Sequence, residues 1–197
     1  MTTRPPTAMY HMLMCQSPLD VEPALLSYDP DELPDGRLRT WKTGKRFASP
    51  PPQPVKVWID EGESGWLKEY NDATVALMSR RLAQALVQAG VSNIEFYEAV
   101  VEDFETGEVH RDHLAFNLIG VVAAADLGRS VYQALDGPVI SVDFDSLALD
   151  EAKAQGALMF RLAEAVTGVV VHDRVKQAIE AAGIDTLTFL PPEQWVG

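Results

Sequence analysis

Two stretches of the chain share one pattern of hydrophobic and polar positions. Residues 78–97 read MSRRLAQALVQAGVSNIEFY, and residues 171–190 read VHDRVKQAIEAAGIDTLTFL. In both, apolar residues recur at positions i, i+3, i+4 and i+7, which is the spacing of one face of a short helix. These positions are Leu82, Ala85, Leu86 and Ala89 in the first copy and Val175, Ala178, Ile179 and Ala182 in the second. The pattern predicts two short amphipathic helices.

The residues that flank each apolar face are typical of helix ends. Ser79 stands at the position of an N-cap, where its hydroxyl can accept a hydrogen bond from an unpaired backbone N–H. In the second copy Asp173 can do the same one position later. Gly90 and Gly183 come where each helix must stop, at the left-handed position that glycine occupies without strain.

Apolar runs before and after each helix predict strands. Residues 73–78 (ATVALM) precede the first helix, and residues 168–171 (GVVV) precede the second. After each helix two apolar residues alternate with polar ones, namely Ile94 and Phe96 in the first copy and Leu187 and Phe189 in the second. Each copy thus predicts a strand, a helix and a strand packed on a sheet. Building this scaffold accounts for every repeated position, and none of them requires chemistry, although Arg81 and Arg174 could serve it.

Elsewhere the pattern favours strands and loops. Strands are predicted at residues 9–15, 55–59, 112–122, 138–144 and 157–162, of which 112–122 is the longest and central. Residues 27–54 have the turn residues and prolines of a loop, and residues 1–8 have the composition of a frayed end. The sequence therefore predicts an α+β fold. We expect a single domain over residues 1–197, built on a mixed sheet with two related strand-helix-strand units.

Charge limits the class of ligand. The chain has 197 residues, a formal net charge of −13 and an isoelectric point near 4.6. This charge argues against nucleic acid or anionic lipid as a direct ligand, because their phosphates would be repelled. It suits a basic protein partner, and it equally suits a chain whose charge only keeps it in solution.

Cysteine content and hydropathy predict a cytoplasmic protein. Cys15 is the only cysteine, so no intramolecular disulfide and no cysteine-based zinc site can form. The most continuous apolar stretch, residues 114–127, is interrupted by Asn117 and is too short to span a bilayer. We expect no membrane segment.

No arrangement of reactive residues predicts an active site. His110 and His113 lie on either side of Asp112, but in a strand their spacing puts them on opposite faces and disfavours a shared metal. Residues 143–151 gather four carboxylates, yet Ala148 stands where a calcium loop needs glycine. No serine lies in a Gly-x-Ser-x-Gly motif. We expect no catalysis, no metal and no cofactor.

The order of these features resembles a known family. A first strand is followed by a loop rich in Trp, Gly and Pro (TWKTGKRFASPPPQP), by the first helical unit, by HLAFNLIGVVAAADLGRSVY, and by a terminal module that begins ALMFRL. Asn117, Asp126 and Ser130 match an Asn-hydrophobic…Asp…Ser segment of that family. Residues 10–192 thereby resemble the bacterial immunity proteins of polymorphic toxin systems, first described from myxobacteria. One departure is GIDTLTF, where Thr-Gly is expected before the last strand.

The resemblance implies a cytoplasmic α+β protein that binds one cognate toxin, encoded by an adjacent gene, and blocks it without catalysis. Many such toxins are nucleases with basic clefts, so an acidic inhibitor could take the place of the phosphates. We expect the interface with the toxin to lie in two acidic loops with an aromatic anchor. For each loop alone, a solvated turn is an equally good interpretation. The candidates are Asp60, Glu61, Glu63 and Trp66 in one loop and Glu102, Asp103, Glu105 and Glu108 in the other.

A basic loop leaves a different class of function open. Five cationic side chains surround Trp41, namely Arg37, Arg39, Lys42, Lys45 and Arg46. They could clamp a phosphate or carboxylate while the indole stacks on it, as in an anion-binding protein or an enzyme. An assembly protein is a third reading, and the sequence does not fix the oligomeric state.

Overall fold

The structure is a computed structural model that describes residues 9–18, 21–63, 65–73, 75–134 and 142–197. Within these ranges it contains two α-helices and fourteen strands, so the predicted α+β class is confirmed. The segment expected to be frayed, residues 1–8, lies outside the described residues. So do residues 138–141 of the strand expected at 138–144.

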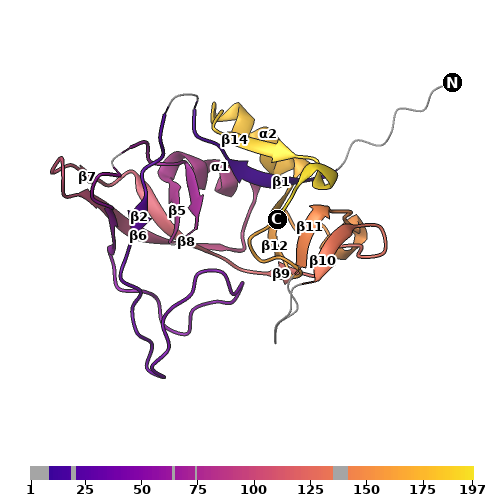
Figure 1. Ribbon diagram of the computed structural model, residues 1–197, viewed down its shortest axis with the longest axis horizontal. Helices are drawn as coiled ribbons and strands as arrows, with labels where there is room; N and C mark the ends of the chain where they lie inside the picture. The colour runs from indigo at the N-terminus through magenta and orange to yellow at the C-terminus, as the bar shows by residue number, and fades with distance from the viewer. Residues whose placement is uncertain (1–8, 19–20, 64, 74, 135–141) are drawn as a thin grey trace.

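The larger sheet has seven strands (Figure 1). They run in the order β2-β3-β6-β8-β5-β4, and β7 pairs with β6 beside this path. Their bounds are β2 (Leu26–Ser27), β3 (Val55–Ile59), β4 (Tyr70–Asp72), β5 (Ala76–Ser79), β6 (Ile94–Asp103), β7 (Val109–His110) and β8 (His113–Leu118). β3 and β6 are parallel, whereas the other neighbours are antiparallel. The sheet is therefore mixed, as predicted.

The smaller sheet has five strands in the order β14-β1-β13-β12-β9. Their bounds are β1 (Tyr10–Cys15), β9 (Val121–Val122), β12 (Met159–Leu162), β13 (Val169–His172) and β14 (Leu187–Leu190). An antiparallel pair, β10 (Val131–Ala134) and β11 (Val142–Ser146), forms a separate two-stranded sheet. Two short 3₁₀ helices follow at Glu151–Ala154 and Pro192–Gln194.

The single long strand expected over residues 112–122 is wrong, because this segment forms two strands in two sheets. β8 ends at Leu118 in the larger sheet, while β9 pairs in parallel with β12 in the smaller one. Gly120 lies between them with φ of +110°, a backbone conformation that favours glycine and turns the chain. β8 still occupies the interior position predicted for this segment, between β6 and β5.

Both copies of the repeat form a strand-helix-strand unit, as predicted. The first is β5, α1 (Arg80–Ala89) and β6, and the second is β13, α2 (Asp173–Ala181) and β14. In neither unit do the two strands pair with each other. β8 lies between β5 and β6, and β1 lies between β13 and β14, antiparallel to both neighbours. Each unit therefore encloses a strand from outside it, which for the second unit is more than 150 residues away in sequence, and α1 and α2 contact each other.

The first helix begins and ends where the sequence predicts. The Ser79 hydroxyl accepts a hydrogen bond from the backbone N–H of Leu82. Gly90 follows the last turn with φ of +93°, and Gly183 takes the same place after α2 with φ of +70°. Both glycines therefore occupy the left-handed conformation that the repeat requires.

The N-cap expected at Asp173 is wrong. His172 caps α2 instead, since its Nδ1 accepts a hydrogen bond of 3.1 Å from the N–H of Arg174. The Asp173 carboxylate has other partners: His11 Nε2 lies 3.1 Å away, and the Gln177 amide donates to it at 2.5 Å. The helix thus starts at Asp173, one residue earlier than an Asp173 cap would place it, and its cap His172 is equivalent to Ser79 in the first copy.

The predicted apolar faces lie in the larger of two cores. The buried residues of α1 include all four predicted positions, Leu82, Ala85, Leu86 and Ala89. In α2, Val175 and Ile179 are buried and Ala178 is partly buried, but Ala182 is exposed. The apolar face of α2 is therefore narrower than predicted.

β13, in the middle of the smaller sheet, is buried on both faces. Val169 and Val171 of β13 belong to the larger core, whereas Val170 belongs to a second core that contains Phe144 and Trp195. A strand with both faces covered requires an uninterrupted apolar run, which explains the GVVV sequence.

A buried ion pair joins the two sheets. The guanidinium of Arg161, on β12, donates two hydrogen bonds to the carboxylate of Asp72, on β4, at 2.6 and 3.0 Å. Arg161 is fully buried, and it also donates to the carbonyl of Val166, while the Tyr70 hydroxyl donates to Asp72. Burial acts to lower the pKa of Arg161, but the hydrogen bonds and charge of Asp72 outweigh it and raise that pKa.

Candidate functional site

The two acidic loops predicted as an interface meet at one end of the larger sheet. β3 and β6 are parallel neighbours, with Trp58 opposite Glu102 and Ile59 opposite Asp103. The loops that follow the two strands therefore leave the sheet at the same end. The backbone N–H of Gly62 in the first loop donates to the Glu105 carboxylate of the second at 3.3 Å. Segments about forty residues apart in sequence thus form one surface.

We call this surface the acidic end. Its carboxylates are Asp60, Glu61, Glu63, Glu102, Glu105 and Glu108. Asp60 and Glu102 are half-buried and the other four are exposed. In Figure 1 the turn between β6 and β7, which carries residues 104–108, lies at the left-hand extremity of the molecule. The acidic end is therefore a projecting edge that a partner can reach.

Asp103 differs from the other predicted interface residues. It is buried, with 6% of its surface exposed. Its Oδ1 accepts hydrogen bonds from the backbone N–H groups of Glu105 at 2.9 Å and Thr106 at 3.0 Å. Asp103 therefore shapes the turn that presents its acidic neighbours.

Trp66, the predicted aromatic anchor, is tied to another part of the chain. It is half-buried and pairs with the segment before β2, because its N–H donates to the Glu22 carbonyl and its own carbonyl accepts from Ala24. It lines a separate depression of about 450 Å³ beside Arg80, Arg81 and other residues. His110, which lies 3.7 Å from Glu108, lines the same depression, so Trp66 borders the acidic end.

An aromatic side chain that the sequence reasoning missed lies in the middle of the acidic end. Phe104 is 73% exposed, although it is large and apolar. It lines a hollow of about 610 Å³ together with Trp58, Ile59, Asp60, Glu61, Gly62 and Glu105. The signal was present in the sequence as EDFE, an aromatic residue flanked by carboxylates in a turn. An exposed aromatic ring within a polar rim is the arrangement of an interface hot spot.

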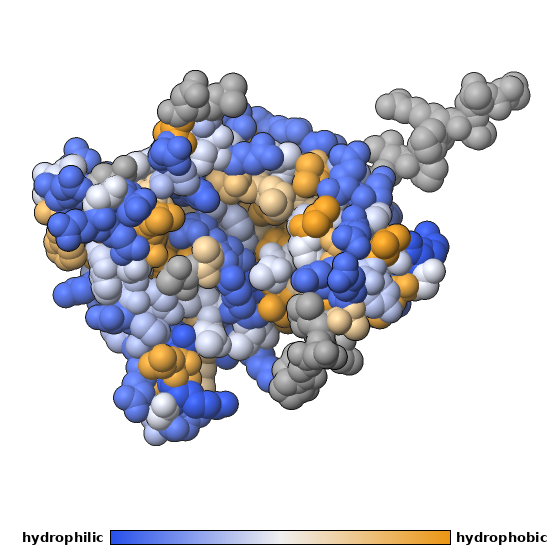
Figure 2. Space-filling model, viewed as in Figure 1, coloured by the Kyte–Doolittle hydropathy of each residue, from blue (hydrophilic) through white to orange (hydrophobic). Residues whose placement is uncertain are grey.

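The charge of the acidic end is largely uncompensated. Within the described residues, five of its carboxylates form no ion pair, and Glu108 lies 3.7 Å from His110. On the face shown in Figure 2, hydrophilic residues predominate and hydrophobic ones form small separate patches. Clustered carboxylates without cations attract a positively charged partner and repel phosphates.

The basic loop, by contrast, has its arginines already paired. The Arg39 guanidinium is buried, donates two bonds of 2.8 Å to Asp31 and lies 4.5 Å above the Phe47 ring. These hydrogen bonds lower the pKa of Asp31. Arg37 pairs with Asp35 at 2.5 Å, and Arg46 pairs with Glu95. Each predicted anion-binding arginine therefore has a carboxylate partner within the chain.

The other predicted members of this alternative site divide between surface and core. Lys45 lines a depression of about 390 Å³ together with the three arginines of this predicted site, whereas Lys42 does not line it. Trp41 is 4% exposed, donates to the Tyr28 hydroxyl at 3.1 Å and packs on Phe47. Its ring is therefore held in the core and does not line the depression that the arginines share.

The histidines also have structural partners. His113 is buried, with Nδ1 3.0 Å from Asp112 and Nε2 3.1 Å from the Lys68 carbonyl. His110 lies on β7, not on the same strand as His113. In the part of the chain that the structure describes, no three His, Cys, Asp or Glu residues are grouped to hold a metal ion. Nor does that part contain a helix long and apolar enough to cross a membrane.

Comparison with known proteins assigns the chain to a family. A model described as an immunity protein family (Imm11) matches residues 16–193. The chain belongs to this family. No curated protein sequence matches it. The immunity-protein resemblance predicted from the motifs is thus confirmed, over nearly the same residues.

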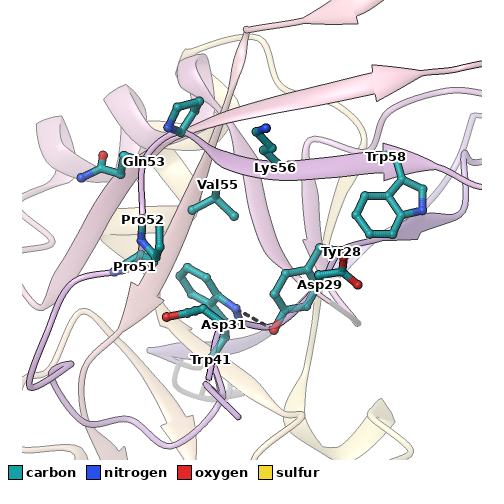
Figure 3. A pocket seen from close by; sticks show the side chains of 11 residues that line it. Tyr28, Asp29, Asp31, Trp41, Pro51, Pro52, Gln53, Val55, Lys56 and Trp58 are labelled. Atoms are coloured by element: carbon teal, nitrogen blue, oxygen red, sulfur yellow. Dashed lines mark hydrogen bonds between the residues drawn. The ribbon is translucent and has the colours of Figure 1, made fainter. Parts of the chain in front are cut away.

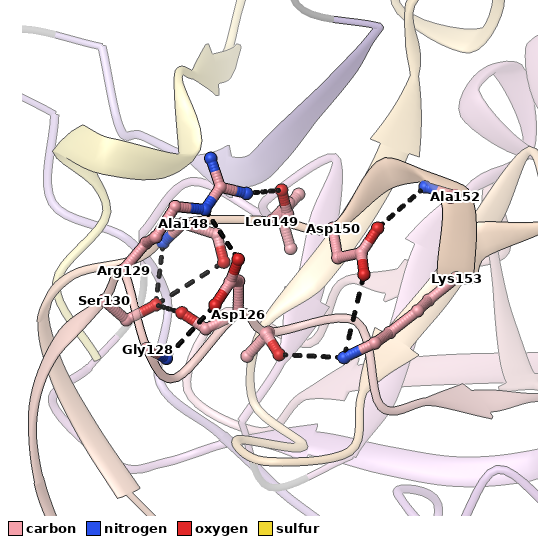
Figure 4. A network of polar contacts seen from close by, with 10 residues as sticks. Asp126, Gly128, Arg129, Ser130, Ala148, Leu149, Asp150, Ala152 and Lys153 are labelled. Carbon is pink, nitrogen blue, oxygen red and sulfur yellow. Dashed lines mark hydrogen bonds and ion pairs between the residues drawn. The ribbon is translucent and has the colours of Figure 1, made fainter.

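The Asp and Ser of the predicted immunity-family segment serve the fold (Figure 4). Asp126 accepts hydrogen bonds from the Gly128 N–H at 3.1 Å and from the Arg129 guanidinium at 2.6 Å. The Ser130 hydroxyl donates to the Asp126 carbonyl and accepts from the Ala148 N–H. The two residues therefore close a turn and tie it to the segment after β11.

Asn117, the remaining residue of that segment in this Imm11 family member, anchors the basic loop. It is fully buried, and its amide nitrogen donates to the Lys45 carbonyl at 2.9 Å. The motif by which the family was recognised therefore maintains the scaffold, and the acidic end is built from residues outside it.

Proposed function

We propose that this Imm11 family member binds one cognate bacterial toxin through the acidic end and neutralises it in interbacterial competition or kin discrimination. The observation that supports this is the convergence of two acidic loops around the exposed ring of Phe104. Family membership supplies the immunity role. The acidic end supplies a surface with the aromatic centre and polar rim of a binding site.

The chemistry of the acidic end favours a nuclease as the toxin. A nuclease presents a basic cleft for the phosphates of its substrate, and a ridge of carboxylates is electrostatically complementary to such a cleft. Inhibition then needs no catalysis by the immunity protein, because occupation of the cleft excludes the substrate. We place the binding in the cytoplasm, where a chain with a single cysteine requires no disulfide.

Co-expression with the toxin domain encoded beside this gene tests the proposal. We expect the wild-type chain to restore growth and to form a stable complex on a sizing column. A variant with Glu61→Gln, Glu63→Gln, Glu102→Gln and Glu105→Gln should bind at least roughly tenfold more weakly, because it removes four uncompensated charges from the interface.

The matched control removes four exposed carboxylates elsewhere: Asp143→Asn, Asp145→Asn, Asp185→Asn and Glu193→Gln. It changes the net charge by the same amount, so it should bind as the wild type does. Equal weakening in both variants would show that net charge alone matters. Absence of rescue and of a complex with the wild-type chain would overturn the immunity role for that toxin.

A further inference from the structure

A second hollow adjoins the acidic end along β3. It has a volume of about 360 Å³ and is lined by Tyr28, Asp29, Asp31, Trp41, the proline segment 51–54, Val55, Lys56 and Trp58. Trp58 lines this hollow and also the hollow beside Phe104. The two hollows thus lie on either side of one aromatic residue, and we call them together the Trp58 groove.

The walls of this groove are aromatic and held in place. Figure 3 shows Pro51 and Pro52 at one end of the first hollow and Trp58 at the other, with Tyr28 and Trp41 between them. The hydrogen bond from the Trp41 indole to the Tyr28 hydroxyl fixes both rings. Trp58 is half-buried on the face of β3 that also carries Lys56. A ligand would thus meet the rings of Tyr28 and Trp58, while the buried Trp41 holds the Tyr28 hydroxyl from the core, so little freedom is lost on binding.

The polar residues of the groove are mostly acidic. Asp29, Asp31, Asp60, Glu61 and Glu105 line its two halves, and Lys56 is the single cation among the lining residues. Asp31 is engaged by Arg39, but Asp29, which is exposed, forms no ion pair with any described residue. A groove with π faces and free carboxylates suits a cation better than an anion or a neutral apolar group.

We infer that the Trp58 groove receives an arginine side chain from the toxin, with its guanidinium against the Trp58 indole and between the carboxylates of Asp29 and Asp60. This inference rests on the proposed function. Arginine fits better than lysine because its planar guanidinium stacks on an aromatic ring and hydrogen-bonds a carboxylate with two N–H groups at once. The volumes of the two hollows are in the range of sites that enclose a small ligand, so they have room for such a side chain.

Binding of the purified toxin to Trp58 variants tests the inference. Trp58→Leu keeps an apolar side chain but removes the π face, and we expect it to weaken the complex at least roughly tenfold. Trp58→Phe keeps an aromatic face and should weaken it less. Because Trp58 is half-buried, the melting temperature of each variant is measured beside its affinity, and only variants that fold as the wild type does are compared. If Trp58→Leu fails to fold, Asp29→Asn combined with Asp60→Asn replaces it, with the same expected loss.

A second measurement does not need the toxin. Titration of the chain with arginine amide, followed by NMR of the tryptophan indole N–H resonances, should shift the Trp58 signal. Norvaline amide, which lacks the guanidinium, should not shift it.

The outcomes separate this inference from the proposed function. Toxin binding that is unchanged by Trp58→Leu would overturn the inference that the groove receives an arginine, while leaving the immunity role intact. A shift with arginine amide but no toxin complex would support cation binding in the groove and overturn the immunity role for that toxin. Concentration-dependent self-association that Trp58→Leu abolishes would assign the groove to a second copy of the chain and overturn the inference.

Discussion

Arg161 is a single side chain that connects the two sheets of the fold. It lies on β12, its charge is balanced by Asp72 on β4, and both are removed from water. A buried pair adds little net stability compared with apolar residues, but removal of one partner leaves an uncompensated charge in a medium of low polarity. The two sheets therefore depend on both residues being present together.

We expect Asp72→Asn to lower the free energy of unfolding by about 3–5 kcal/mol, because it leaves the guanidinium of Arg161 buried without a counter-charge. The double variant Asp72→Leu/Arg161→Met should recover much of this loss. Urea denaturation of the three proteins measures both effects. Asp35→Asn, which breaks an exposed pair with Arg37, is the control and should unfold much as the wild type does. If Asp72→Asn alone lowered the free energy of unfolding only slightly, the claim that Arg161 depends on its buried partner would be wrong.

Asp31 gives the basic loop a pH dependence. Its pKa is lowered in the folded state by the hydrogen bonds from Arg39. The resulting stability is fully present above the unfolded-state pKa of about 3.8 and is lost as the pH falls through the lower folded-state value. We expect the melting temperature of Asp31→Asn to fall less than that of the wild type between about pH 5 and pH 2. If the melting temperatures of the two proteins fell equally with pH, the pair of Asp31 with Arg39 would not contribute to stability.

At the scale of elements, the repeat predicted both units but not the strands they enclose. The apolar spacing of residues 78–97 and 171–190 is a local signal, and both helices lie where it places them. The pairing of β1 with β13 and β14 joins residues more than 150 positions apart. No local pattern specifies such a neighbour. The N-cap of α2 was missed for a related reason, because His11 and Gln177 hold the side chain of Asp173.

The equivalent glycines of the two units should respond differently to substitution. Both have positive φ, so alanine is strained at either position, by about 1–3 kcal/mol. A Cβ at Gly90 would also lie 3.3 Å from the Arg174 guanidinium, whereas a Cβ at Gly183 meets nothing within 4 Å. We therefore expect Gly90→Ala to destabilise more than Gly183→Ala in urea unfolding. The reverse order would show that the contact with Arg174 is easily relieved.

At the scale of the whole molecule, charge is concentrated where partners are expected. Most residues of the acidic end could be chosen from the sequence, because acidic loops are visible in it. That the two acidic loops lie side by side could not be predicted, since it depends on the parallel pairing of β3 with β6. For the same reason Phe104 and Trp58, which lie in two different segments, were not recognised as parts of one surface.

This distribution of charge should accelerate toxin binding. We expect the association rate constant to fall at least roughly tenfold between 50 and 500 mM NaCl, because salt screens the attraction. The variant that neutralises four carboxylates of the acidic end should start slower and depend less on salt, whereas the matched control should behave as the wild type. Stopped-flow mixing measures these rates. A wild-type rate independent of salt would exclude electrostatic steering.

The place of β1 between β13 and β14 has a consequence for synthesis on the ribosome. Residues 55–110, which carry the acidic end, leave the ribosome well before residues 169–190, so β1 has no partner strand until β13 and β14 have been made. The acidic end is thus made before the sheet that holds β1 can be completed. A nascent chain truncated before β13 would carry the acidic loops on a body whose smaller sheet had not closed.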